Sequence, residues 1–71
     1  MVARLGTIQM WILDQIGPEG WGPMSEADLR ADAGVAGFSP DNVTNALAAL
    51  SARGLVEVVS RRGLQALWRL P

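Results

Sequence analysis

Apolar residues near the start of the chain recur three or four positions apart, which is the period of one face of a helix. They are Leu5, Ile8, Ile12 and Ile16. The pattern predicts a first helix over residues 2–16, with Trp11 beside the apolar stripe. Gly17 and Pro18 are expected to end this helix. The segment 17–23 is rich in glycine and proline and is therefore expected to be a loop.

Capping residues predict where a second helix begins and ends. Ser25 is a good N-cap, because its side chain can accept a hydrogen bond from a free backbone N–H of the first turn. The helix is expected to run to about Ala33, with Gly34 as its C-terminal glycine. A turn is expected after Gly34, and its two bulky residues, Val35 and Phe38, are expected to fill the core.

The third helix has the clearest start in the chain. Ser39 is the predicted N-cap, and Pro40 occupies the first helical position, where a missing N–H costs nothing. Gly54 is expected to close the helix. Together with the second helix and the short turn between them, this helix makes a helix-turn-helix. Its predicted buried stripe consists of Val43, Ala46, Leu47 and Leu50.

Two strands are expected after the third helix. Residues 55–60 are rich in valine, as strands are, and residues 64–70 alternate between apolar and polar positions. Residues 61–63, with the sequence Arg-Arg-Gly, supply the turn, and residues 22–24 could add a very short strand against this hairpin. The predicted fold class is α+β, mostly α, with a three-helix helix-turn-helix core and a C-terminal two-stranded β-hairpin.

Size and composition limit the range of functions. A chain of 71 residues with 49% hydrophobic residues predicts one folded domain over residues 1–71. It contains neither cysteine nor histidine, so the usual zinc ligands are missing, and no cofactor or small-molecule ligand is evident. It also lacks lysine and tyrosine, and an enzyme is not expected. No apolar run approaches the roughly 18 residues of a membrane span, and we expect a cytoplasmic protein without membrane contact.

Charge is distributed unevenly along the chain. Residues 1–42 contain two arginines against six carboxylates, whereas residues 43–71 contain four arginines against one carboxylate. The net charge of −1 does not by itself suggest a nucleic-acid partner, but the basic second half could present a local positive field. All six basic residues are arginine, which suits phosphate and guanine. A GC-rich genome would produce the same bias without a functional reason.

The residues from about 24 to 70 resemble the winged helix-turn-helix superfamily of bacterial and phage transcription regulators. The resemblance is carried by the segment 39–47 (SPDNVTNAL), by Leu50, by the glycine-leucine-valine entry at 53–57 (RGLVE) and by the hairpin residues 61–63 and 68–70. It implies that the third helix enters the DNA major groove and that the hairpin, or wing, lies on the DNA backbone. It is a resemblance of fold, so the function it implies is an analogy.

The resemblance assigns the DNA contacts to the exposed side of the third helix and to the wing. Asparagine can pair with adenine, threonine can contact a phosphate or a thymine methyl, and the arginines would meet phosphate or the minor groove. Before Arg53 the exposed side carries no basic residue, so one monomer is expected to bind weakly, and a two-fold dimer would double the contacts. The candidate DNA-binding residues are Ser39, Asp41, Asn42, Thr44, Asn45, Ala48, Arg53, Arg61 and Arg62.

Two functions remain open at this point. The first is a small protein that binds double-stranded DNA, as a transcriptional regulator or phage-type repressor, with homodimerisation left open. The alternative is a winged helix that acts as a protein–protein interaction module without DNA binding; the net negative charge and the high apolar content favour it. An apolar surface patch around Trp21 or Leu67 would favour the alternative, in which Ala48, Ala49 and Ala52 would allow close helix approach. Trp11 and Trp68 are expected in the core. Trp21 is expected to pack in the core or within its loop, and whether it is an exposed anchor for a partner stays open.

Overall fold

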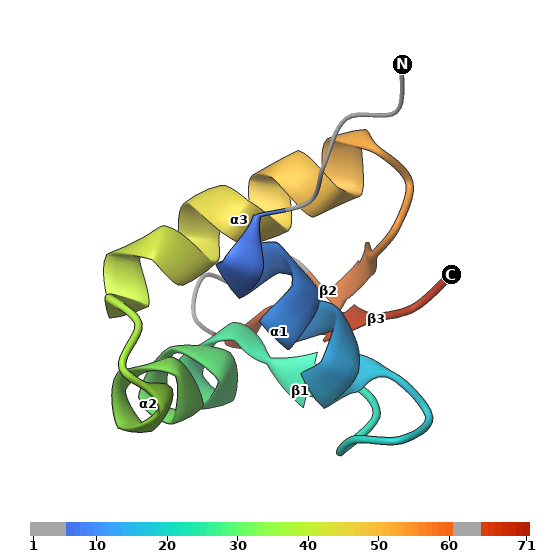
Figure 1. Ribbon diagram of the computed structural model, residues 1–71. Coiled ribbons are helices and arrows are strands. Elements are labelled where there is room, and N and C mark those ends of the chain that lie inside the picture. Colours follow the sequence, from blue (N-terminus) through green and yellow to red (C-terminus); the bar gives the residue numbers. More distant parts are fainter. Residues whose placement is uncertain (1–5, 61–64) are drawn as a thin grey trace.

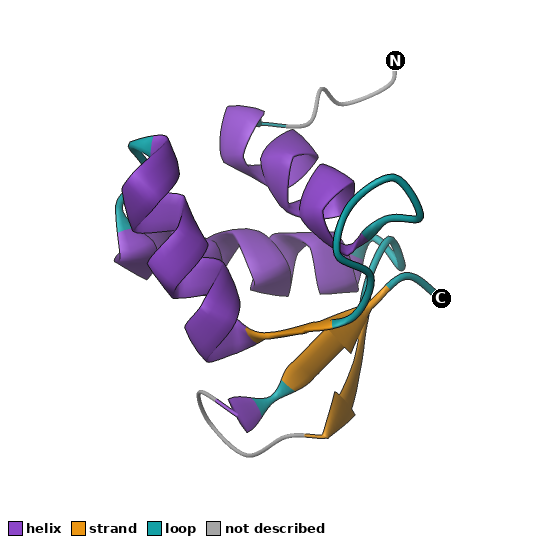
Figure 2. Cartoon of the chain, turned by 90° about the horizontal axis from the view of Figure 1, so that it is seen from below, coloured by secondary structure: helices purple, strands orange, loops and turns teal. Residues whose placement is uncertain are grey.

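The computed structural model describes residues 6–60 and 65–71, and in this part of the chain it contains three helices and a three-stranded antiparallel sheet (Figure 1). This confirms an α+β fold that is mostly helical. The sheet forms one side of the molecule, and the helices lie on the other side (Figure 2). The elements are α1 (Thr7–Ile16), β1 (Met24–Ser25), α2 (Glu26–Ala36), α3 (Pro40–Ala52), β2 (Glu57–Ser60) and β3 (Leu67–Arg69).

The first helix is shorter than predicted. It begins at Thr7, not at residue 2, because the backbone of Gly6 is extended and the N–H of Gly6 donates to the side-chain oxygen of Gln9 at 3.2 Å. That hydrogen bond caps the helix start, and residues 1–5 lie outside the described residues. The predicted end at Ile16 is confirmed, with Gly17 as the extended residue that follows it.

The start of α2 is confirmed, but its predicted end is wrong. The Ser25 hydroxyl accepts a hydrogen bond from the N–H of Asp28 at 3.1 Å, as an N-cap does. The helix then continues through Gly34 to Ala36. Gly37, with φ of 93°, is the left-handed residue that ends it, and its N–H donates to the Gly34 carbonyl at 3.2 Å.

The later end of α2 has different outcomes for the two residues that were expected to fill the core: Phe38 packs against the core as expected, and Val35 does not. Phe38 follows Gly37, and its N–H donates to the Ala33 carbonyl at 2.8 Å, so the ending is a Schellman motif. This motif directs the ring of Phe38 against the core and against Trp11, with ring centroids 5.5 Å apart. Val35 instead lies on the outer side of the helix and is 90% exposed, so its predicted place in the core is wrong.

The third helix has the predicted bounds and the predicted buried face. Ser39 is extended and Pro40 is the first helical residue, although the Ser39 side chain makes no capping hydrogen bond. Gly54, with φ of 72°, ends the helix as predicted, and the N–H of Leu55 donates to the Leu50 carbonyl at 3.0 Å. The four stripe residues Val43, Ala46, Leu47 and Leu50 are all buried.

The three strands pair antiparallel in the order β1-β3-β2, so the short strand expected before α2 does lie against the hairpin. Met24 pairs with Trp68, and a register irregularity interrupts the pairing of β2 with β3 between Val58 and Ser60. Both hairpin strands are shorter than predicted. Strand β3 starts only at Leu67, and the Ala66 carbonyl just before it accepts the N–H of Glu26 at 2.9 Å. The predicted turn at residues 61–63 lies outside the described residues.

The core lies where the helices meet one another and the sheet. Its fully buried large side chains are Ile12, Leu29, Val43, Leu47 and Leu50, and they come from all three helices. Trp11 and Trp68 pack against this core and are partly buried, which places both where the sequence predicted. Every helix therefore contributes to one common core.

The corrected end of α2 predicts opposite effects for two glycine substitutions. Gly34→Ala should raise the free energy of unfolding by about 0.5–1 kcal/mol, because Gly34 is helical and a Cβ there would meet nothing within 4 Å. Gly37→Ala should lower it by about 1–2 kcal/mol, because alanine tolerates positive φ poorly. Chemical denaturation followed by circular dichroism measures both. The reverse order of the two variants would show that the helix ends at Gly34.

Candidate nucleic-acid interface

The outer face of α3 carries the candidate contact residues of the third helix. All of them are exposed, because the opposite face of the helix is buried in the core. Arg53 stands just beyond the C-terminal end of the helix, and Ser39 stands just before its start. Arg61 and Arg62 lie outside the described residues. The exposed candidates are Ser39, Asp41, Asn42, Thr44, Asn45, Ala48 and Arg53.

Two of these candidates are tied to α2 by a cluster of polar side chains that sequence reasoning missed. Arg30 donates two hydrogen bonds from its guanidinium group, from Nη2 to the Asp41 carboxylate and from Nη1 to the Thr44 hydroxyl, each at 3.0 Å. The Thr44 hydroxyl in turn donates to the carboxylate of Glu26 at 3.1 Å. We call Glu26, Arg30, Asp41 and Thr44 the α2–α3 cluster. Its hydrogen-bonded partners are 11 to 18 residues apart in the sequence, so no local sequence pattern predicts the cluster.

The α2–α3 cluster alters the chemistry of the predicted interface. The Thr44 hydroxyl donates its only hydrogen within the cluster, and Asp41 accepts from Arg30, so both side chains already have partners. The cluster holds two carboxylates against one guanidinium and is therefore negative overall. The side chains of Asn42, Asn45 and Arg53 have no partner among the residues that the structure describes.

Carboxylates outnumber arginines in the described part of the chain. Arg30, Arg53 and Arg69 face seven carboxylates, which gives 3 − 7 = −4 for residues 6–60 and 65–71. Arg69 pairs with Glu57 across β3 and β2, with Nε and Oε1 2.6 Å apart. Arg53 is thus the one arginine of the described ranges without an ion pair in them. Any strong attraction for phosphate must come from few groups.

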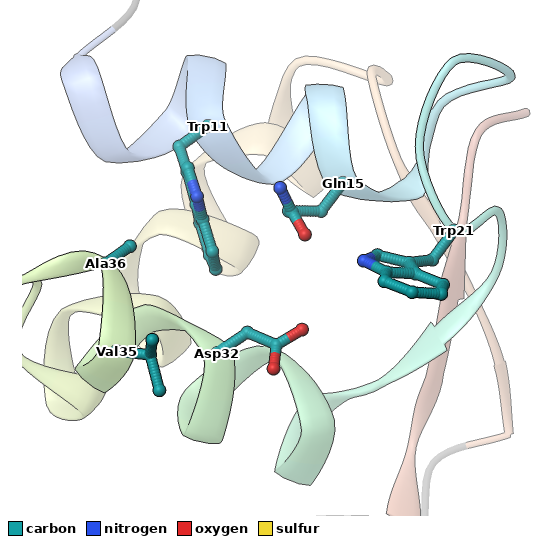
Figure 3. Close-up of a pocket in the computed structure, with 6 residues that line it drawn as sticks. All are labelled: Trp11, Gln15, Trp21, Asp32, Val35 and Ala36. Carbon is teal, nitrogen blue, oxygen red and sulfur yellow. The ribbon is translucent and has the colours of Figure 1, made fainter.

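A second surface feature is a hollow between α1, α2 and the loop that joins α1 to β1 (Figure 3). Its volume is about 300 Å³, and it is open to solvent. Trp21 is 77% exposed, so its ring does not pack in the core, which was one of the two expected places. The residues that line the hollow are Trp11, Gln15, Trp21, Asp32, Val35 and Ala36.

The loop that carries Trp21 is held against the end of α1. The N–H of Trp21 donates to the Gln15 carbonyl at 2.7 Å, and the N–H of Gly20 donates to the Gly17 carbonyl at 3.0 Å. A Cβ at Gly20 would collide with the carbonyl oxygens of Asp14 and Gln15, so only glycine allows this close approach. The exposed ring therefore projects from a backbone that is fixed by hydrogen bonds.

The described residues contain no group of three or more acidic, histidine or cysteine side chains that could hold a metal ion. None of the described helices combines the length and the apolar character that would let it cross a membrane. Comparisons with protein-family models, with curated proteins and with solved structures each found no match. The assignment of function therefore depends on the chemistry of the two surface features.

The α2–α3 cluster predicts energetic coupling between the two helices. In a double-mutant cycle of Arg30→Ala and Asp41→Ala, the interaction free energy should lie near the upper end of the range of about 0.2–1 kcal/mol that exposed ion pairs show. The value should be high because Thr44 and Glu26 extend the network beyond a single exposed pair. Urea denaturation measures the coupling. It should shrink at high salt, which screens exposed charges. The matched cycle of Arg30→Ala with Asp14→Ala should be additive, and equal coupling in both cycles would contradict the assignment.

Proposed function

We propose that the protein is a small DNA-binding protein of the winged helix-turn-helix type, acting as a transcription regulator or phage-type repressor. The order of elements supports this proposal, since α2, a short turn and α3 are followed by the β2–β3 hairpin, and β1 pairs with β3. The observation that carries it is the outer face of α3, which presents polar side chains to solvent along a helix whose other face is fully buried.

In this proposal base edges are read by those side chains of α3 that have no partner among the described residues. Asn42 and Asn45 can each donate to and accept from adenine in the major groove, and the Ala48 methyl can contact a thymine methyl. Asp41 and Thr44 have a different role, because the α2–α3 cluster engages them and they set the position of α3 against α2. The exposed Asp41 carboxylate would favour cytosine and repel phosphate nearby.

Phosphate contacts come from the two ends of α3 in this proposal. Pro40 has no N–H, and the N–H of Asn42 donates to the Ser39 carbonyl at 3.0 Å. The start of α3 therefore offers the backbone N–H of Asp41, and Arg53 at the other end offers a guanidinium without an ion pair in the described residues. The contacts proposed for Arg61 and Arg62 would add to these. So few cations make one protomer a weak binder, and a two-fold dimer that reads two half-sites would bring the affinity into the range of a regulator.

A titration of fluorescent duplex DNA tests this function. Random-sequence duplex should bind weakly at low salt, and the affinity should fall as salt is raised. Arg53→Ala should weaken binding to all sequences and lower the slope of log affinity against log salt by about 1. The paired change of Arg61→Ala with Arg62→Ala should lower it further. Met10→Ala, an exposed change on α1, should leave the titration unchanged.

The recognition of specific DNA bases by α3 needs a separate test. After selection of a preferred site from a random library, Asn45→Ala should lose about 1–3 kcal/mol at one base position while binding to random DNA stays the same. Equal loss on every sequence would remove Asn45 from the set of base readers. If the folded wild-type protein binds no duplex even at low salt, the DNA-binding proposal is wrong.

A second function is favoured by one specific observation, the hollow beside the exposed ring of Trp21. Tryptophan is enriched at the centres of protein interfaces, and Trp21 projects from a fixed loop, so little ordering is needed on binding. The excess of carboxylates in the described residues also suits a protein partner better than a polyanion. Under this alternative the domain is an interaction module without DNA binding.

A further inference from the structure

The hollow combines features that suit a positively charged side chain. We infer that it is a binding site for an arginine side chain carried on a basic segment of a partner protein. This inference supplies a partner chemistry for the interaction-module function, on which it rests, and it does not require that α3 bind DNA. It is carried by two tryptophans and one carboxylate that three separate elements bring to the same space (Figure 3).

The aromatic part of the site consists of Trp11 from α1 and Trp21 from the loop. Figure 3 shows both rings directed into the space between α1 and α2 from different sides. Indole faces attract cations more strongly than the other aromatic rings, and a guanidinium group also stacks flat on them. Trp11 is held in place by its contact with Phe38, and Trp21 by the hydrogen bond of its backbone to Gln15.

The charged part of the site is the carboxylate of Asp32. It projects from α2 towards the space between Gln15 and Trp21 (Figure 3). Within the described residues Asp32 has no ion pair, whereas Asp41 and Glu57 are each paired with an arginine. A guanidinium in the hollow could donate two parallel hydrogen bonds to Asp32 and a further one to the amide oxygen of Gln15.

Asp32 is the carboxylate that lines the hollow, and the segment around it is acidic, which favours a cation over nucleic acid. Residues 6–38 contain five carboxylates and a single arginine, and that arginine is Arg30, which is bonded to Asp41 and Thr44. A volume of about 300 Å³ suits one long side chain and not a folded domain. Arginine fits better than lysine, because its planar fork can stack on indole and pair with a carboxylate at the same time.

The test is a titration of the whole protein with a short capped peptide of glycine and arginine, followed by calorimetry and by the indole N–H signals in NMR spectra. The signals of Trp11 and Trp21 should move, and that of Trp68 in β3 should not. Asp32→Asn and Trp21→Ala should each weaken binding by about tenfold or more. Asp14→Asn removes the same charge from α1 outside the hollow and should change the affinity by less than about twofold.

Matched peptides complete the test. Replacement of arginine by citrulline, which has nearly the same shape without the charge, should abolish binding, and replacement by lysine should weaken it. Equal binding of the citrulline peptide, or full affinity in Asp32→Asn, would overturn the cation site. Equal binding of the lysine peptide would overturn the choice of arginine. If a neutral or acidic peptide alone moves the Trp21 signal, the cation site is wrong while the interaction-module function stands.

Discussion

Burial of the apolar stripe of α3 is the constraint on which the rest of the structure depends. In a chain of 71 residues few large side chains are available, and the stripe supplies three of the five large side chains that are completely buried among residues 6–60 and 65–71. The stripe is covered by α1 and α2, so the positions of both helices depend on the burial of this stripe. The same burial fixes which side of α3 faces solvent, and the candidate DNA contacts lie there because the other side is occupied.

Two small connections keep the sheet and the helices together. The two residues of β1 pair with β3 directly before α2 begins, and the N–H of Glu26 is bound to the Ala66 carbonyl. The start of α2 is thereby anchored to the hairpin, although about 40 residues separate them in the sequence. This anchor matters for function, because α2 carries part of the α2–α3 cluster and also Asp32 of the hollow.

The pairing of charges connects the two surface features. Arg30 and Arg69 are engaged by carboxylates, so they contribute little free positive field to the outer face of α3. On the other side of α2, Asp32 is left without such a partner in the described residues. The described surface thus offers a polar helix without net positive charge on one side and an aromatic, anionic hollow on another. A protein that binds DNA through α3 and a basic partner through the hollow would use both.

The sequence by itself determined the existence of α1, α2 and α3, the end of α1, the starts of α2 and α3, and the outward side of α3, but not the start of α1. Local rules sufficed, because the cap at Ser25, the helix start at Pro40, the stop at Gly54 and the stripe from Val43 to Leu50 act within one or two helical turns. The end of α2 could not be decided in this way, since Gly34 and Gly37 are both able to end a helix. The packing of Phe38 against Trp11 favours Gly37 as the residue that ends the helix, and the longer helix leaves Val35 exposed.

Only the tertiary structure decided the chemistry of the two candidate sites. The α2–α3 cluster joins residues from different helices, and the hollow joins Trp11, Trp21 and Asp32 from three elements. No periodicity or spacing links these residues, because their proximity results from the packing of α1, α2, α3 and the loop after α1 against one another. Sequence determined which residues face outwards, while packing between distant segments determined which of them meet.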